Sequence, residues 1–270
     1  MTTDTLKNLT KPKIIFFDID DTLYIKYQNI VPNSVFIALQ QVKAQGIIVA
    51  IATGRGRAVF PKAIDALIQE VGIELVVSIN GQCSHHQGNL LAHYPLTSSQ
   101  LSEVTEYLIS QNLSYAYMTD EGIMAMLEDE ALIEALSSLH IPYKLINLAD
   151  FDNRQAVYQI LAFHPDNHTL QLALPDSIKT IRWHKNGIDI LDAEGSKARG
   201  IEQALKALGL TFADAWAFGD GLNDIEMLQK VAFGVAMGNA HPSLKAVADY
   251  VCPNAADEGI YQGLKNLGVI

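Results

Sequence analysis

The chain has 270 residues, of which 49% are hydrophobic and 18% are charged, and its formal net charge is −11 at pH 7. This length can fill one large core, or one core and a smaller second domain. The negative charge argues against nucleic acid as a partner, because a phosphate backbone attracts a basic surface. It also means that a site for a small anion needs local positive charge from a metal, a few cations or backbone amides.

Three features favour a cytoplasmic protein without a membrane segment. Cys83 and Cys252 are the only cysteines and lack metal-ligand spacing, so we expect two free thiols in a reducing compartment. Residues 1–13 are polar and lack the apolar stretch of a signal peptide. No uninterrupted apolar run approaches the roughly 18 residues that a membrane span needs.

The first quarter of the chain alternates short apolar runs with helical periodicity. The apolar runs predict buried strands over 14–17, 47–52 and 75–79. The helical periodicity predicts helices over 34–45 and 58–71. Repeated strand, helix and strand units with apolar strands are typical of a parallel sheet that is covered on both faces.

After Asn80-Gly81 the pattern changes to that of an α+β domain. Alternating and apolar runs predict a hairpin over 83–93 and strands over 115–119, 123–127, 157–163 and 178–184. Helical patterns predict a helix capped by Thr97 or Ser98, and further helices over 130–139 and 169–174. We therefore expect an inserted domain, the cap, over residues 83–186.

The α/β pattern then returns and continues towards the end of the chain. The predicted strands are 188–191, 216–219 and 233–236, and the predicted helices are 197–208, 224–231 and 242–248. The predicted fold class is therefore α/β. It consists of a doubly wound parallel-sheet core over residues 1–82 and 187–270, with the α+β cap inserted into it.

Three polar clusters follow predicted strands, and a fourth opens a predicted helix. They are Asp18–Thr22, Thr53–Arg55, Gly219–Asp224 and Ser196-Lys197. In open α/β sheets, ligands bind beyond the carboxyl ends of the strands. Asp18 and Asp20 would repel each other at this spacing unless a cation lies between them. The pattern therefore indicates a divalent metal beside a carboxylate that can attack an electrophile, which is the chemistry of phosphoryl transfer.

These clusters resemble the four motifs of the haloacid dehalogenase-like (HAD) phosphohydrolases, and within them the Cof-type group with a class IIB cap. The stretch Asp18-Ile19-Asp20-Asp21-Thr22 matches the Asp-x-Asp-x-Thr loop, Thr53 matches the strand-ending Thr or Ser, and Lys197 matches the motif lysine. Gly219–Asp224 matches Gly-Asp-x-x-Asn-Asp, and Ser78-Ile79-Asn80-Gly81 resembles the entry to the cap. The resemblance implies a Rossmann-like HAD core and a Mg²⁺-dependent phosphatase.

The expected chemistry gives each carboxylate a role. Asp18 would attack phosphorus to form an aspartyl phosphate, and Asp20 would protonate the leaving alkoxide and then accept a proton from the attacking water. Asp18, the main-chain carbonyl of Asp20 and Asp220 would hold Mg²⁺, with Asp224 close by or bridged through water.

The remaining motif residues are expected to bind phosphate. Thr53 would donate its hydroxyl, and Gly54 leaves backbone amides open at a helix start, where anions are favoured. Lys197 would supply a point charge to the phosphate and to Asp18, and Asn223 is a neutral donor.

Several positions stay open at this point. Asp21 stands where the family more often has Gly, and it adds a third nearby carboxylate. Arg55 is expected either to contact the substrate or to form an ion pair on the core. Four side chains on the cap strands either pack in a core or in part face the active site and select the substrate. They are Tyr115, Tyr117, Met118 and Met124.

The leading hypothesis is a monomeric cytoplasmic phosphatase of small phosphorylated metabolites. The resemblance implies sugar phosphates or phosphorylated cofactors, such as pyridoxal phosphate or flavin mononucleotide. One alternative is a phosphomutase, which would return the phosphoryl group to the same sugar. Another is a non-catalytic metabolite-binding protein with the same fold.

Overall fold

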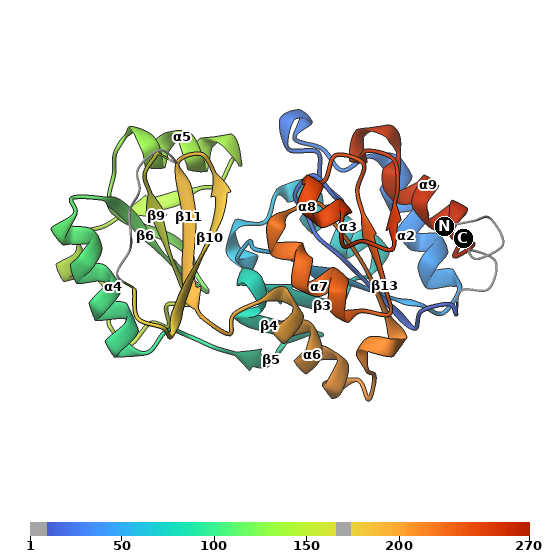
Figure 1. Cartoon of the computed structure of the whole chain (residues 1–270), viewed down its shortest axis with the longest axis horizontal. Coiled ribbons are helices and arrows are strands. Elements are labelled where there is room, and N and C mark those ends of the chain that lie inside the picture. The colour runs from blue at the N-terminus through green and yellow to red at the C-terminus, as the bar shows by residue number, and fades with distance from the viewer. Residues whose placement is uncertain (1–9, 166–173) are drawn as a thin grey trace. The chain divides into compact units, whose positions relative to one another are not determined.

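A computed structural model of the chain describes residues 10–165 and 174–270, which form two compact units (Figure 1). The larger unit consists of the chain up to Gly54, Pro61–Ala92 and Ser196–Ile270. The smaller unit consists of Arg55–Phe60 and His93–Gly195. Among the helices of the described ranges, none combines the length and the apolar character of a membrane span.

The described part of the larger unit contains an eight-stranded sheet in the order β14-β13-β12-β1-β2-β3-β4-β5. The strands are β1 (Ile14–Phe17), β2 (Ile48–Ala52), β3 (Leu75–Ser78), β4 (Cys83–His86), β5 (Asn89–His93), β12 (Ala215–Gly219), β13 (Phe233–Ala236) and β14 (Tyr250–Val251). The strands from β14 to β3 pair in parallel, and β4 pairs antiparallel with β3. Strands β1 and β12 are continuous apolar segments because every one of their residues is buried.

Helices pack on this sheet in two groups, as a doubly wound fold requires. The helices are α2 (Asn33–Ala44), α3 (Lys62–Val71), α6 (Lys197–Ala207), α7 (Ile225–Lys230), α8 (Pro242–Lys245) and α9 (Gly259–Asn266). Helix α2 contacts α3 and α9, whereas α6 contacts α7 (Figure 1). Both cysteines of the chain are buried in this unit as free thiols, as expected.

The strand order reverses at β1. From β1 the chain passes through α2 to its neighbour β2, and on the other side of β1 lies β12, which is followed by α7 and β13. The loops that follow β1 and β12 therefore leave the sheet side by side and diverge. Such a switch point is where open α/β sheets bind their ligands.

The smaller unit has a sheet and a core of its own. Its described residues form a six-stranded sheet in the order β10-β11-β9-β6-β7-β8, antiparallel except for the β7–β8 pair. The strands are β6 (Ser114–Thr119), β7 (Gly122–Leu127), β8 (Tyr143–Leu145), β9 (Gln159–Phe163), β10 (Ile178–His184) and β11 (Gly187–Asp192). The helices are α4 (Ser98–Ser110), capped by Thr97, and α5 (Glu130–Ser138).

The structure assigns three of the four open side chains of this unit to its core. Tyr115, Tyr117 and Met124 pack in one hydrophobic cluster with residues of α4. The Tyr117 hydroxyl lies 2.7 Å from Thr105 Oγ1 on that helix. Met118 is buried outside this cluster, because successive residues of a strand point to opposite faces of the sheet.

Two predicted domain assignments are corrected by the sheets. The hairpin over 83–93, expected in the cap, extends the larger sheet, because β4 pairs with β3 directly after a tight turn. The strand over 188–191, expected in the core, is β11 of the smaller sheet, because it forms a hairpin with β10. In both cases the strand pairs with the strand that directly precedes it in the chain, to which a short turn connects it.

Other predicted elements differ in their bounds. The helix expected over 58–71 begins only at Lys62, because Pro61 precedes it and a short 3₁₀ turn covers Arg57–Val59. Strands β8 and β14 and helix α9 were not predicted. The helix expected over 169–174 falls mostly on residues 166–173, which lie outside the described residues.

Candidate active site

Two of the predicted carboxylates leave the sheet at its switch point. Asp18 follows β1, and its backbone N–H donates to the carbonyl of Phe218 on β12 at 3.0 Å. Asp220 follows β12 itself. The parallel pairing of β1 with β12 therefore places residues 202 positions apart in the sequence at the same edge of the sheet.

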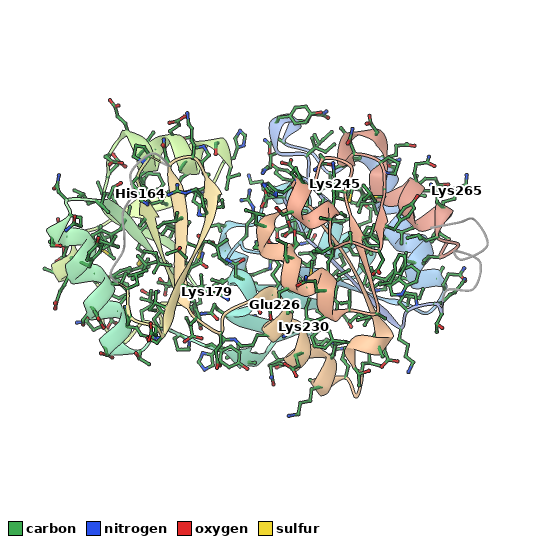
Figure 2. The ribbon with its side chains drawn as sticks, viewed as in Figure 1. His164, Lys179, Glu226, Lys230, Lys245 and Lys265 are labelled. Atoms are coloured by element: carbon green, nitrogen blue, oxygen red, sulfur yellow. The ribbon has the colours of Figure 1, made fainter. Side chains whose placement is uncertain are left out.

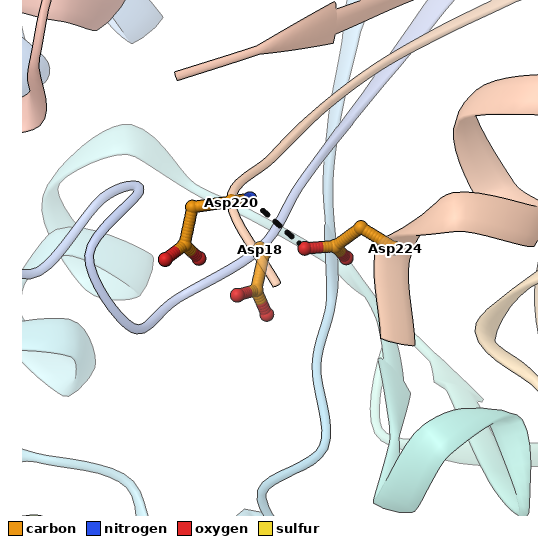
Figure 3. A group of neighbouring side chains, drawn as sticks. All are labelled: Asp18, Asp220 and Asp224. Carbon is orange, nitrogen blue, oxygen red and sulfur yellow. Dashed lines mark hydrogen bonds between the residues drawn. The ribbon is translucent and has the colours of Figure 1, made fainter. Parts of the chain in front are cut away.

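A third carboxylate completes the group shown in Figure 3. Asp18, Asp220 and Asp224 each offer an oxygen, and these oxygens all lie within 4.8 Å of one another. In residues 10–165 and 174–270 no other group of acidic, histidine or cysteine side chains has a comparable geometry. An oxygen-only set of this kind can hold a hard divalent cation.

Lys197 joins two of these carboxylates. Its ammonium Nζ lies 2.7 Å from Asp18 Oδ1 and 2.6 Å from Asp224 Oδ1. The side chain of Lys197 is completely buried, whereas that of Lys230, which is labelled in Figure 2, is exposed to solvent. The Ser196 hydroxyl accepts the N–H of Arg199 and so caps the helix that carries Lys197, as the sequence predicts.

Asp224 also organises the loop after β12. Its Oδ2 accepts the backbone N–H groups of Asp220 at 3.0 Å and of Gly221 at 2.9 Å. Its Oδ1 binds the Lys197 ammonium. Both Asp224 oxygens therefore accept hydrogen bonds, and this carboxylate holds Lys197 and the loop in place.

The charges of this site do not balance. Burial raises the pKa of Asp18 to about 7, and Asp224 and Asp20 act in the same direction, while the Lys197 ammonium lowers it. Burial also raises the pKa of Asp220 well above its usual range, with Asp18 and Asp224 adding to the effect. Burial alone would lower the pKa of Lys197, but Asp18 and Asp224 raise it, so the ammonium stays charged. The carboxylates outnumber this ammonium, and a further cation would relieve their repulsion.

Three of the predicted phosphate-binding residues, Thr53, Gly54 and Asn223, lie near the end of β2. Thr53 is buried, and its backbone N–H extends the sheet by donating to the carbonyl of Val77 at 2.8 Å. A Cβ atom built on Gly54 would lie 3.4 Å from Asn223 Nδ2, so Gly54 and Asn223 are neighbours. The structure therefore brings Thr53-Gly54 next to the Asn223 loop, although Gly54 and Asn223 are 169 positions apart in the sequence.

Asp21 has a structural partner that the sequence analysis missed. Its φ of +54° lies in the left-handed region, which favours glycine. Its carboxylate accepts the backbone N–H of Lys26 at 3.2 Å and lies 2.9 Å from the Lys26 ammonium. Burial alone would lower the pKa of Lys26, but Asp21, Asp20 and Asp220 together raise it. Lys26 thus neutralises Asp21 close to Asp20.

Arg55, for which the sequence left open a substrate contact or an ion pair on the core, lies at the start of the segment Arg55–Phe60 of the smaller unit. It is buried, and its guanidinium donates to the carbonyl of Val59 at 3.2 Å and to that of Leu139, the C-cap of α5, at 3.0 Å. The second bond gives a hydrogen-bond donor to a carbonyl at the C-terminal end of α5, and together the two bonds join the segment Arg55–Phe60 to that helix. A substrate contact by Arg55 stays a prediction.

We expect Arg55→Lys to destabilise the protein by about 1–3 kcal/mol. A lysine ammonium cannot donate to both carbonyls in the geometry of the guanidinium, so one buried carbonyl is left without this donor. The measurement is the urea midpoint of unfolding. Arg57→Lys is the matched control, because Arg57 is exposed and its contact with the Phe60 ring also suits an ammonium. Equal midpoints for the two variants would contradict a structural role of Arg55.

Comparison with known proteins identifies the family. The chain matches the haloacid dehalogenase-like hydrolase family over residues 15–264 and belongs to it. It is 32% identical to "Putative phosphatase YkrA" of Bacillus subtilis (strain 168), over 96% of this chain and 98% of that protein. It is a phosphatase of the Cof-type group, as its motifs predict.

Two further relatives carry more specific names. The chain is 25% identical to the 5-amino-6-(5-phospho-D-ribitylamino)uracil phosphatase YwtE of Bacillus subtilis (strain 168), over 92% of this chain and 95% of that protein. The solved structure of the HAD subclass IIB sugar phosphatase BT4131 matches with a TM-score of 0.87 and 25% identity, covering 97% of this chain and 100% of that chain. These matches agree with a Rossmann-like HAD core and an inserted cap.

Proposed function

We propose that this phosphatase hydrolyses small phosphomonoesters in a Mg²⁺-dependent reaction through an aspartyl phosphate on Asp18. The observation that carries the proposal is the buried Asp18–Lys197–Asp224 arrangement beside Asp220 at the switch point of the sheet. Such a site combines a nucleophilic carboxylate, a fixed cation and an oxygen-only metal set. The cytoplasmic location and the monomeric state stay predictions.

The positions of the side chains support a distinct role for each residue of the site. Asp18 Oδ1 is held by Lys197, which leaves Oδ2 as the oxygen that attacks phosphorus. Asp20 is half-buried two residues further on, where it can protonate the leaving alkoxide and then accept the proton of the attacking water. Thr53, Gly54, Asn223 and the Lys197 ammonium would hold the phosphate oxygens.

The donor set suits a hard cation. Asp18, Asp220 and the main-chain carbonyl of Asp20 would hold Mg²⁺, with Asp224 acting indirectly, because oxygen ligands without nitrogen or sulfur are the set that Mg²⁺ prefers. When bound, this cation stabilises negative charge on the phosphoryl oxygens. The Lys197 ammonium holds Asp18 at a fixed angle and keeps Asp224 from repelling the incoming anion.

The substrate class is a small phosphorylated metabolite. Support comes from the relatives named for a phosphorylated ribitylamino-uracil and for sugar phosphates. The test is phosphate release from a panel of sugar phosphates, pyridoxal phosphate and flavin mononucleotide, with Mg²⁺ and with EDTA. Release that needs Mg²⁺ would support the proposal. Silence across the panel would contradict it, and isomerised sugar phosphate with little free phosphate would point to a mutase.

The raised pKa of Asp18 predicts how metal binding depends on pH. The pKa of the Asp18 carboxyl is about 7 in the folded protein and near 3.8 in the unfolded chain. Its protonation therefore stabilises the metal-free folded state fully below pH 3.8, and this contribution is lost as the pH rises through about 7. We expect the free energy of unfolding of the metal-free protein to fall by on the order of 1 kcal/mol between pH 6 and pH 8. Mg²⁺ should bind more tightly over the same window, because the proton leaves Asp18.

The measurement is the melting temperature at both pH values, with EDTA and with Mg²⁺. A larger Mg²⁺-induced rise at pH 8 than at pH 6 is the expected result. In Asp18→Asn the dependence on pH should weaken, since asparagine does not titrate in this range and Asp220 is then the carboxyl with a raised pKa that remains. If Mg²⁺ raised the melting temperature of the wild type equally at both pH values, the pH dependence could not be assigned to the Asp18 carboxyl.

A further inference from the structure

The turn that follows β3 has an unusual backbone. Ile79, Asn80 and Gly81 all have left-handed φ angles, of +51°, +50° and +80°. For a β-branched residue such as Ile79 this conformation is an outlier that costs roughly 1–2 kcal/mol. Strain of this kind persists where the surroundings demand it, and it concentrates at functional sites.

The surroundings of this turn are the motif segments of the active site. The backbone N–H of Asn80 donates to the carbonyl of Thr53 at 3.0 Å. A Cβ atom on Gly81 would lie 1.9 Å from the carbonyl oxygen of Ser196, so only glycine allows this approach to the start of the helix that carries Lys197. The turn therefore fixes the spacing between the Thr53 segment and the Lys197 helix.

The Asn80 side chain reaches a third motif segment. It is completely buried, and its Oδ1 accepts a hydrogen bond from Asn223 Nδ2 at 3.0 Å. A Cβ atom on Gly54 would lie 3.2 Å from Asn80 Oδ1, so the two asparagines meet against Gly54. The pair thus lies beside Thr53-Gly54, where the phosphate is proposed to bind.

An asparagine amide can present either its oxygen or its NH₂ group to a ligand, and only the NH₂ group attracts a phosphate. Asn80 Oδ1 accepts one N–H of Asn223, which turns the NH₂ group of Asn223 towards Gly54 and its oxygen away. The second N–H of the same group is then available to a phosphate oxygen. A buried acceptor thus determines which end of Asn223 the substrate meets.

We infer that Asn80 is a positioning residue that orients the Asn223 amide for the phosphate, and that the strained turn serves to place it there. The inference rests on the proposed phosphatase function and adds to it a residue that acts through Asn223. It predicts that removal of the Asn80 side chain lowers kcat/KM strongly only when residue 223 is an asparagine, whose amide Asn80 orients.

The test is a double-mutant cycle with Asn80→Gly and Asn223→Ala, measured as kcat/KM on the best substrate of the panel with Mg²⁺. Glycine accepts the left-handed backbone, so Asn80→Gly deletes the side chain without adding strain. We expect Asn80→Gly alone to lower kcat/KM by about 10- to 100-fold, as loss of an oriented donor does. In the Asn223→Ala background the same change should cost less than about 3-fold, because coupled residues are not additive.

Inhibition by inorganic phosphate provides a second readout, and its Ki should rise in both single variants. Asn112→Gly is the matched control, because Asn112 is an exposed asparagine with a left-handed φ of +52° in the smaller unit. This control should leave kcat/KM and Ki unchanged. If Asn80→Gly does not fold, Asn80→Ser takes its place, since its hydroxyl fills part of the buried space.

The possible outcomes separate the two proposals. An active wild type in which the effects of Asn80→Gly and Asn223→Ala multiply would overturn the role of Asn80 and leave the phosphatase function standing. Unfolding of both Asn80 variants would assign Asn80 to fold stability alone and would also overturn it. A wild type without phosphatase activity would overturn the proposed function, and the inference with it.

Discussion

Asp18→Asn is expected to abolish phosphate release while the protein stays folded. The change keeps the shape of the side chain but removes the nucleophilic oxygen, and loss of a nucleophile lowers kcat by roughly 10⁴-fold or more. Folding should survive, because Lys197 keeps its bond to Asp224 and one buried charge of a repelling group is gone. The measurement is kcat with Mg²⁺ on the best substrate, together with the melting temperature.

The control for Asp18→Asn is Glu202→Gln, which removes one negative charge from an exposed position of helix α6. It should leave kcat and the melting temperature unchanged. If Asp18→Asn kept more than about a tenth of the wild-type kcat, covalent catalysis by Asp18 would be wrong. In that case the three carboxylates would serve metal binding alone.

Lys197→Met is expected to remove both activity and stability. It leaves Asp18 and Asp224 buried without their ammonium, and breaking a buried ion pair from one side costs about 3–5 kcal/mol. Activity should fall because Asp18 loses its fixed orientation and the phosphate loses a positive charge. Urea unfolding and kcat measure the two effects.

Two variants make this second prediction specific. Lys206→Met is the matched control, since Lys206 is exposed on the same helix, and it should change neither quantity. Lys197→Met combined with Asp18→Asn should recover part of the lost stability, because it removes one of the uncompensated carboxylates, while activity stays absent. A Lys197→Met protein as stable as the wild type would refute the buried ion-pair assignment.

The sequence predicted local structure best where one segment decides its own conformation. The run Ile14–Phe17 is a strand because each of its residues is apolar and buried on both faces. Helix α6 begins after Ser196 because the serine side chain caps it. The helix expected over 58–71 begins only at Lys62, although apolar residues recur at helical spacing before it, because Pro61 starts a helix more readily than it continues one.

Local sequence patterns did not predict which partner a segment or a side chain takes, even where that partner is close in the chain. The strand β11 is apolar enough for either sheet, and only its hairpin with β10 decides that it joins the smaller one. In the same way, a polar residue such as Lys26 carries no signal of its own, although the additional carboxylate of Asp21 within the first motif indicates that a cation lies nearby.

By itself, the sequence determined the α/β class, the family and the set of reactive residue types, because these depend on short motifs and on periodicities that each segment carries alone. The tertiary structure decided which of those residues meet. The parallel pairing of β1 with β12 joins Asp18 to Asp220, the buried ammonium of Lys197 holds Asp18 against Asp224, and a strained turn brings Asn80 to Asn223. Such contacts depend on strand order and on close packing between distant segments, and neither is encoded in the spacing of residues along one segment.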